Sequence, residues 1–171
     1  IVCGDPVIWK PSEKTPLTAL ACQSLFERAA KKFGEAPDNL SQIVIGGSDV
    51  GEVLVDHPEV ALISATGSTR MGQIVGPKVA ARFGRSLLEL GGNNALILTA
   101  SADLELAEKA ILFSAVGTAG QRCTSLRRLI VHRSIKEDVL ARLRSAYSSI
   151  TIGNPLEDGV LVGPLIDGQA G

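Results

Sequence analysis

Short apolar runs alternate with stretches of helical periodicity along the first half of the chain. The apolar runs predict strands at 7–9, 43–45, 60–64 and 86–90. Between these runs, apolar residues return every three or four positions, which predicts helices at about 16–33, 50–55 and 69–83. Strands that alternate with helices are typical of a parallel sheet covered on both faces, so we expect an α/β fold.

The second half keeps this alternation but changes in content after Gly92. The pattern predicts strands at 95–98 and 129–131, and helices at about 102–115 and 135–147. From Gly153 onward the chain is rich in Gly, Pro and Asp, which predicts a loop. We place a domain boundary at Gly91-Gly92, which divides the chain into residues 1–91 and 92–171.

The composition is that of a globular protein and narrows the function classes. Of the 171 residues, 45% are hydrophobic and 20% are charged, which excludes general disorder. The formal net charge of −1 and the lack of a long apolar run argue against a nucleic-acid or membrane partner. Three widely spaced cysteines form neither a CxxC pattern nor a disulfide framework, which favours a reducing cytoplasm. The uncapped ends at Ile1 and Gly171 lead us to expect a piece of a longer protein.

Two predicted turns carry residues suited to a nucleotide ligand. Parallel sheets bind ligands where the carboxyl ends of strands meet the N-termini of helices. At Gly67-Ser68, a glycine would let the backbone approach a phosphate, and the hydroxyl and free N–H groups could hold it. Lys10 and Glu13 follow the first strand and could both reach ribose hydroxyls. For each turn taken alone, an ordinary N-capped helix or a solvated surface turn is the better explanation.

Two further residues have reactive side chains. Cys123, in the run G-Q-R-C-T, is intrinsically nucleophilic as a thiolate, and a buried inert cysteine is the alternative, which we accept for Cys3 and Cys22. Glu89 stands among leucines, which suits a strand buried on both faces and a carboxylate used as a general base. Its alternative is an outward-pointing side chain. His57 has no nucleophile partner in the sequence, and neither a Ser/His/Asp arrangement nor a metal-ligand cluster is present.

Together and in this order, these motifs resemble those of the aldehyde dehydrogenase superfamily, from about Val7 to Leu165. The specific signal is the pair of runs L-E-L-G-G, which contains Glu89, and G-Q-R-C-T, which contains Cys123. Within the superfamily, residues 83–95 and 115–124 are most similar to the antiquitin branch, the α-aminoadipic semialdehyde dehydrogenases.

The resemblance implies an NAD(P)+-dependent enzyme that oxidises an aldehyde to a carboxylic acid. Residues 1–91 would be the C-terminal part of a Rossmann-like cofactor domain, and residues 92–171 the start of an α/β catalytic domain. Cys123 would attack the aldehyde to give a thiohemiacetal. Hydride transfer to the nicotinamide would leave a thioester, and Glu89 would activate the water that hydrolyses it.

The resemblance also implies which residues hold the cofactor. They follow predicted strands, and they are Lys10 and Glu13 for the adenosine ribose, Gly67 and Ser68 for the pyrophosphate with Gly46-Gly47 nearby, and Leu90 beside the nicotinamide. A carboxylate at position 13 would repel a 2′-phosphate, which favours NAD and leaves NADP as an alternative.

Arg122 resembles the antiquitin residue that pairs with the substrate α-carboxylate, and most superfamily members lack it. This role suits a guanidinium, which can grip a carboxylate with two hydrogen bonds. The predicted substrate is therefore α-aminoadipic semialdehyde, and another aldehyde stays open as an alternative.

The chain departs from the family pattern in one place and lacks two of its motifs. The family's Phe-Thr-Gly-Ser reads Ala65-Thr66-Gly67-Ser68 here. The Pro-Trp-Asn motif, whose Asn helps form the oxyanion hole, should precede residue 1, and the Glu-Ile-Phe-Gly-Pro motif should follow Gly171. We therefore expect this chain alone to be a poor enzyme. The resemblance also implies that its parent is a homodimer or homotetramer. A non-catalytic binding or scaffold protein on the same fold is the second alternative.

Overall fold

The computed structural model describes residues 1–170 and divides into two compact units. Unit 1 covers Ile1–Glu89, and unit 2 begins at Leu90. Both units consist of helices and short strands, and every strand pair is parallel, which confirms the predicted α/β class. No helix within the described residues is both long enough and apolar enough to cross a membrane.

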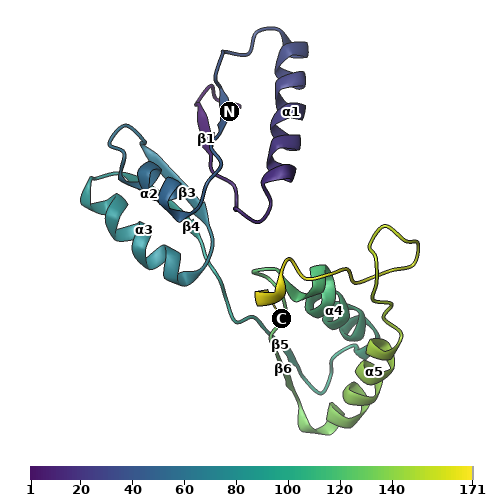
Figure 1. Cartoon of the computed structure of the whole chain (residues 1–171). Coiled ribbons are helices and arrows are strands. Elements are labelled where there is room, and N and C mark those ends of the chain that lie inside the picture. The colour runs from purple at the N-terminus through teal and green to yellow at the C-terminus, as the bar shows by residue number, and fades with distance from the viewer. Residues whose placement is uncertain (171) are drawn as a thin grey trace. The chain divides into compact units, whose positions relative to one another are not determined.

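Unit 1 contains two parallel ladders of two strands each (Figure 1). Its elements are β1 (Val7–Trp9), α1 (Pro16–Phe33), β2 (Ser41–Ile43), α2 (Ser48–Asp56), β3 (Leu62–Thr66), α3 (Thr69–Ala81) and β4 (Arg85–Glu89). Strand β1 pairs with β2, and β3 pairs with β4 in a register that places Thr66 opposite Glu89.

The local sequence explains where α1 begins and ends. Pro16 occupies the first turn, where its missing N–H costs no intrahelical bond, and Gly34 ends the helix in a left-handed conformation with φ of 85°. Gln23 holds the helix to β2, because its side-chain amide donates to the Ser41 carbonyl over 2.9 Å and accepts from the Ser41 hydroxyl. The core of the other ladder is aliphatic and is formed by Val55, Ile63, Val75 and Val79.

Strand β2 lies two residues earlier than the sequence pattern predicts, at 41–43 instead of 43–45. The ladder bonds run from the Val7 N–H to the Leu40 carbonyl and from the Val44 N–H to the Trp9 carbonyl. The next donor in this progression is Pro11, which has no N–H. Pairing therefore stops before the apolar run ends.

Unit 2 contains one parallel ladder and two main helices (Figure 1). Its strands are β5 (Ala95–Leu98) and β6 (Arg128–Val131), and its longer helices are α4 (Leu104–Val116) and α5 (Lys136–Ser148). Short 3₁₀ turns are η1 (Gly117–Gly120), η2 (Arg133–Ile135) and η3 (Gly168–Ala170). Leu98, Ile111 and Val139 form the buried core of unit 2, so β5 and both helices contribute to it.

Candidate active site

In unit 1 the predicted cofactor residues lie at the carboxyl ends of the parallel strands. Lys10 follows β1, Gly46-Gly47 lies beyond β2, and Gly67-Ser68 follows β3. Glu89 is the last residue of β4, and its carbonyl oxygen accepts a hydrogen bond from the Gly67 N–H over 2.9 Å. Carboxyl ends of parallel strands are where such folds bind ligands, so these placements suit a binding role.

Lys10 and Glu13 form an ion pair on the turn after β1. Lys10 Nζ lies 3.7 Å from Glu13 Oε2 and donates to the Pro11 carbonyl over 2.7 Å. The Lys10 side chain is 16% exposed, whereas Glu13 is 63% exposed. A Cβ added at Gly51 of α2 would lie 3.4 Å from Lys10 Cδ, so the lysine stem passes close to this glycine. The turn therefore presents an anchored ammonium and an open carboxylate next to each other.

Ser68 caps the N-terminus of α3, as the structural alternative proposed. Its hydroxyl oxygen accepts from the Met71 N–H over 3.1 Å, and its carbonyl accepts from the Gly72 N–H. Within residues 1–170, the N–H groups of Thr69 and Arg70 are left without an acceptor. A capped helix with two free N–H groups in its first turn can still receive an anion, so the cap does not contradict the binding role.

At positions 46 and 67, a residue larger than glycine would collide with a neighbouring side chain. A Cβ at Gly46 would overlap the Val50 side chain, and one at Gly67 would lie 2.7 Å from Met71 Cε. The loops before α2 and α3 therefore run close to the helices that follow them. Both positions keep the backbone bare at the carboxyl ends of strands, which lets a ligand approach it closely, although the Gly67 N–H itself is paired with the Glu89 carbonyl.

The expected burial of Glu89 is wrong for the part of the chain that the structure describes. The residue is exposed, and Leu87 of the same strand is 54% exposed. The reason is that β4 has one strand neighbour, β3, so its second edge is not paired within residues 1–89. The carboxylate is therefore accessible at the end of the strand, as its outward-pointing alternative described.

Cys123 is an exposed free cysteine on a tight turn in unit 2. The Ser125 N–H donates to the Arg122 carbonyl over 3.1 Å, and the Arg122 N–H donates to Ser125 Oγ over 3.1 Å. Ser125 is only 1% exposed, so the turn rests on a buried hydroxyl. Among the described residues nothing accepts from the Cys123 N–H, which leaves thiol and amide available on one exposed residue.

Asn94 is a functional candidate that the sequence analysis missed. Its side-chain amide donates to the Cys123 carbonyl over 2.7 Å and to the Ser125 carbonyl over 3.1 Å. Its backbone carbonyl accepts from the Arg127 and Arg128 N–H groups. The signal in the sequence is weak, because an asparagine directly before a strand is ordinarily a turn residue.

Arg122 lies along the end of α4 (Leu104–Val116). Its Nη2 donates to the Phe113 carbonyl over 3.2 Å, its Nε donates to the Gly117 carbonyl over 3.3 Å, and its guanidinium carbon lies 5.0 Å from the centre of the Phe113 ring. The Phe113 carbonyl also accepts from the Gly117 N–H at the helix end, so the guanidinium adds a second hydrogen bond to it. These contacts hold the side chain that the resemblance assigns to the substrate carboxylate.

The backbone before the cysteine turn is left-handed at three consecutive residues. Thr118, Ala119 and Gly120 have φ of 55°, 54° and 71°. This conformation is costly for residues with a Cβ, particularly a β-branched one, and persists where surrounding contacts impose it. Gln121 supplies two such contacts, because its N–H and its side-chain amide both donate to the Thr118 carbonyl.

The other two cysteines are not buried, contrary to the expectation. Cys3 and Cys22 are both exposed. For Cys22 the reason is its place on α1, a helix whose buried residue is Ala19. Within residues 1–170, no group of three or more His, Cys, Asp and Glu side chains could hold a metal ion.

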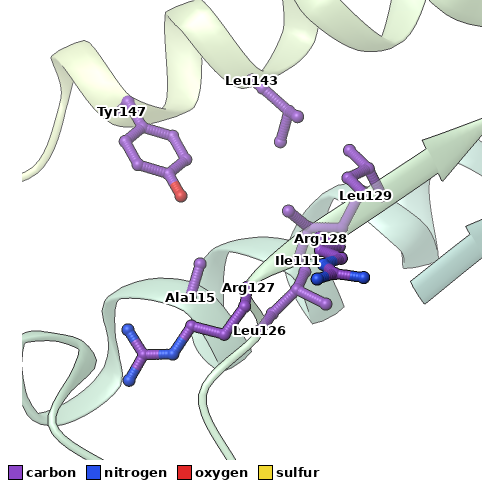
Figure 2. Close-up of a pocket in the computed structure, with 8 residues that line it drawn as sticks. All are labelled: Ile111, Ala115, Leu126, Arg127, Arg128, Leu129, Leu143 and Tyr147. Atoms are coloured by element: carbon purple, nitrogen blue, oxygen red, sulfur yellow. The ribbon is translucent and has the colours of Figure 1, made fainter. Parts of the chain in front are cut away.

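A cavity of about 240 Å³ lies in unit 2 between α4, α5 and β6, and Figure 2 shows Leu143 and Tyr147 of α5 facing Ile111 and Ala115 of α4. Its lining is mostly aliphatic and does not include Cys123. It offers neither a nucleophile nor a carboxylate, so we do not assign the chemistry to it.

Comparison with known proteins places the whole described chain in one family. Residues 1–170 match the model of the aldehyde dehydrogenase family. A putative aldehyde dehydrogenase family 7 member A1 homolog of Caenorhabditis elegans is 49% identical, over 99% of this chain and 32% of its own length. The α-aminoadipic semialdehyde dehydrogenase of Mus musculus is 45% identical, over 99% of this chain and 31% of its own. The chain thus spans about a third of the curated relatives it matches.

Solved structures agree with the sequence comparison. The crystal structure of an NADP-dependent enzyme of E. coli matches with a TM-score of 0.90 and 35% identity, over 96% of this chain and 33% of that one. The betaine aldehyde dehydrogenase of Staphylococcus aureus in complex with NAD+ matches with a TM-score of 0.87 and 32% identity, over 96% and 32%.

Proposed function

The chain belongs to the aldehyde dehydrogenase family, and on this basis we propose that it is a segment of an enzyme that oxidises an aldehyde to a carboxylic acid with NAD(P)+. The observation that carries the proposal is the presentation of Cys123, an exposed thiol on a turn with its own N–H unpaired among the described residues. A nucleophile in this role needs both access and a nearby donor for the oxygen that becomes negatively charged.

Unit 1 fits a nicotinamide dinucleotide on the evidence of its loops. Gly67 keeps the backbone bare where α3 starts, and the free N–H groups of Thr69 and Arg70 suit a pyrophosphate. The ion pair of Lys10 and Glu13 offers a donor and an acceptor for ribose hydroxyls. Gly46-Gly47 and Leu90 complete the proposed set. When bound, the cofactor supplies the acceptor for the hydride that leaves the substrate carbon.

Cys123 and Glu89 carry the covalent chemistry in this proposal. The thiolate of Cys123 attacks the carbonyl carbon, and the Cys123 N–H donates to the resulting oxyanion. After the carbon is oxidised to a thioester, Glu89 takes a proton from the water that attacks it, and the carboxylic acid and the thiolate are released. The exposure of the Glu89 carboxylate leaves it open to such a water. Glu89 is the last residue of unit 1 and Cys123 belongs to unit 2, and the proposal assigns a separate step to each.

The proposed substrate is an aldehyde that carries an α-amino carboxylate, such as α-aminoadipic semialdehyde. Relatives at 44–49% identity include proteins named for this substrate. Arg122 is the proposed partner of the carboxylate because it precedes the nucleophile directly and carries a planar, permanently charged group. A simple or betaine aldehyde is the competing substrate, and Arg122→Ala separates them: it lowers kcat/KM for the carboxylate-bearing aldehyde far more than for a neutral one.

The assay that tests the proposal is NADH formation by the full-length protein that carries residues 1–171, with aminoadipic semialdehyde and with neutral aldehydes. We expect Cys123→Ala to abolish NADH formation and the matched variant Cys22→Ala, also an exposed cysteine, to retain it. No NADH from any aldehyde would contradict the proposal, and activity in Cys123→Ala would show that another residue is the nucleophile.

The rival proposal is a binding or scaffold protein on the same fold. An effect of NAD on the rate of Cys123 alkylation separates the two, because a catalytic thiol shares its site with the nicotinamide. We further propose that the full-length protein is a homodimer or homotetramer. We also propose that it works in a reducing cytoplasm, and three free cysteines support this compartment. Size-exclusion chromatography with light scattering tests the assembly.

A further inference from the structure

We propose that Asn94 is a positioning residue for the nucleophile, an inference that rests on the proposed role of Cys123. Asn94 is half-buried and directly precedes β5. Its Nδ2 lies 2.7 Å from the Cys123 carbonyl oxygen and 3.1 Å from the Ser125 carbonyl oxygen. Only the NH₂ end of an asparagine can face two acceptors, so its orientation follows from its surroundings. Both of its amide hydrogens are therefore committed to the cysteine turn.

The bond to the Cys123 carbonyl fixes more than one atom. A peptide unit is planar, so holding the carbonyl oxygen holds the Thr124 N–H and restricts the ψ angle of Cys123. On the other side, the Arg122 N–H is held by Ser125 Oγ. The backbone of Cys123 is thus tied on both flanks, while its thiol stays exposed.

The backbone of Asn94 extends the same connection to the far end of the turn. Its carbonyl accepts from the Arg127 N–H over 3.0 Å and from the Arg128 N–H over 3.1 Å, where β6 begins. The residue therefore clamps the chain segment from Cys123 to Arg128 onto the start of β5. Loss of the side chain leaves these two backbone bonds in place, so it frees the turn without removing β6 from its ladder.

A thiol that must reach a carbonyl carbon in one geometry is sensitive to its backbone. Misplacement by about 1 Å can cost on the order of 100-fold in rate. Asn94 touches neither substrate nor cofactor in this proposal, and it acts through the position of Cys123. Its loss should lower kcat and leave the dissociation constant for NAD unchanged, because the residues proposed to hold NAD precede position 94.

The test compares Asn94→Ala and Asn94→Asp with the control Asn154→Asp in the full-length protein. Asn94→Ala removes both donors, and Asn94→Asp also puts a carboxylate against two carbonyl oxygens. Asn154 lies in the same unit, but its Oδ1 accepts from the Leu156 N–H over 3.1 Å, so an aspartate there keeps its bond. We expect kcat to fall about 100-fold in Asn94→Ala, at least as far in Asn94→Asp, and to stay at the wild-type value in Asn154→Asp.

The second readout is the pH profile of iodoacetamide alkylation, followed at each cysteine by mass spectrometry. We expect the Cys123 profile to change in both Asn94 variants while those of Cys3 and Cys22 stay the same, a pattern that general unfolding would not give. If kcat and the Cys123 profile match wild type in Asn94→Ala, the proposal is overturned, as it is if Asn154→Asp loses as much. If wild type makes no NADH but the Cys123 profile still changes, the proposed function fails and the clamp stands.

Discussion

The guanidinium of Arg122 lies over the ring of Phe113, with 5.0 Å between its carbon and the ring centroid, and donates to the carbonyl of the same residue. Phe113 is itself 70% exposed, so this contact lies at the surface of unit 2. The residue before the proposed nucleophile is therefore anchored to the last turn of α4. A substrate carboxylate that binds Arg122 must outcompete or share these contacts.

Arg122→Lys keeps the charge but loses the planar group that bonds two carbonyls and stacks on the ring. We expect a lower melting temperature and about a tenfold lower kcat/KM for an aldehyde that carries a carboxylate, which corresponds to about 1.4 kcal/mol for one lost charge-assisted bond. A neutral aldehyde should be affected much less. Arg133→Lys, at an exposed position of η2, is the control and should change neither value.

Gly117→Ala should disturb Arg122 without changing it. A Cβ at this position would overlap the guanidinium, so the arginine must leave the Phe113 carbonyl and ring. We expect a small loss of melting temperature and a change in KM for the carboxylate-bearing aldehyde at unchanged affinity for NAD. Gly168→Ala, where an added Cβ meets nothing within 4 Å, is the matched control. If Gly117→Ala and Gly168→Ala have identical KM values, Arg122 does not bind the substrate carboxylate.

Ser68→Ala separates the capping role of this residue from its proposed binding role. Loss of the N-cap of α3 should cost about 1 kcal/mol of stability. Loss of the hydroxyl should also raise the dissociation constant for NAD by up to about tenfold. Asp103→Ala removes the N-cap of α4, where Oδ1 accepts from the Glu105 and Leu106 N–H groups. It should cost similar stability in urea unfolding and leave NAD binding, measured by calorimetry, unchanged.

Lys78 of α3 links that helix to α2 and makes its stability contribution depend on pH. Its ammonium donates to the Glu52 carboxylate and, over 3.1 Å, to Asp56, and these hydrogen bonds raise the pKa of Lys78 above its ordinary value. Because the pKa is raised, the ion pairs of Lys78 contribute fully to the free energy of unfolding below the ordinary lysine pKa. This contribution disappears as the pH rises through the raised pKa of Lys78. Lys78→Met should therefore unfold at lower urea than wild type at pH 7.

At strongly alkaline pH the urea midpoints of Lys78→Met and wild type should converge. High salt should also reduce the difference at pH 7, because the three side chains are solvent-accessible and screened. A difference that stays constant from pH 7 into the alkaline range would mean that the lysine stem, and not its charge, stabilises the contact between α2 and α3.

Sequence reasoning located the elements of the fold well and their edges less well. Parallel pairing and the order of helices and strands follow from periodicity, because a helix and a buried strand repeat at different intervals. The end of β2 depends on a partner: Pro11, 30 residues before Ser41, lacks the N–H that would have extended the ladder beyond Val44. No local pattern at residues 41–45 contains that information.

The candidate site shows the same division. The nucleophile and the carboxylate stand out through their residue types and the runs that surround them. Asn94 does not, because its contacts with Cys123 and Ser125 span 29 and 31 positions in the chain and only the folded turn brings them together. The exposure of Glu89 was missed for a similar reason, since an apolar run does not reveal how many strands flank it.

The left-handed run at Thr118 and Ala119 has a consequence for engineering. Each of these residues pays a conformational penalty on the order of 1–2 kcal/mol that glycine would not. Substitution by glycine at either position is therefore a rare case in which the most flexible residue raises the free energy of unfolding. If the left-handed backbone at Thr118 also sets the position of the Cys123 thiol, a higher melting temperature gained by substitution at 118 would come with a lower kcat.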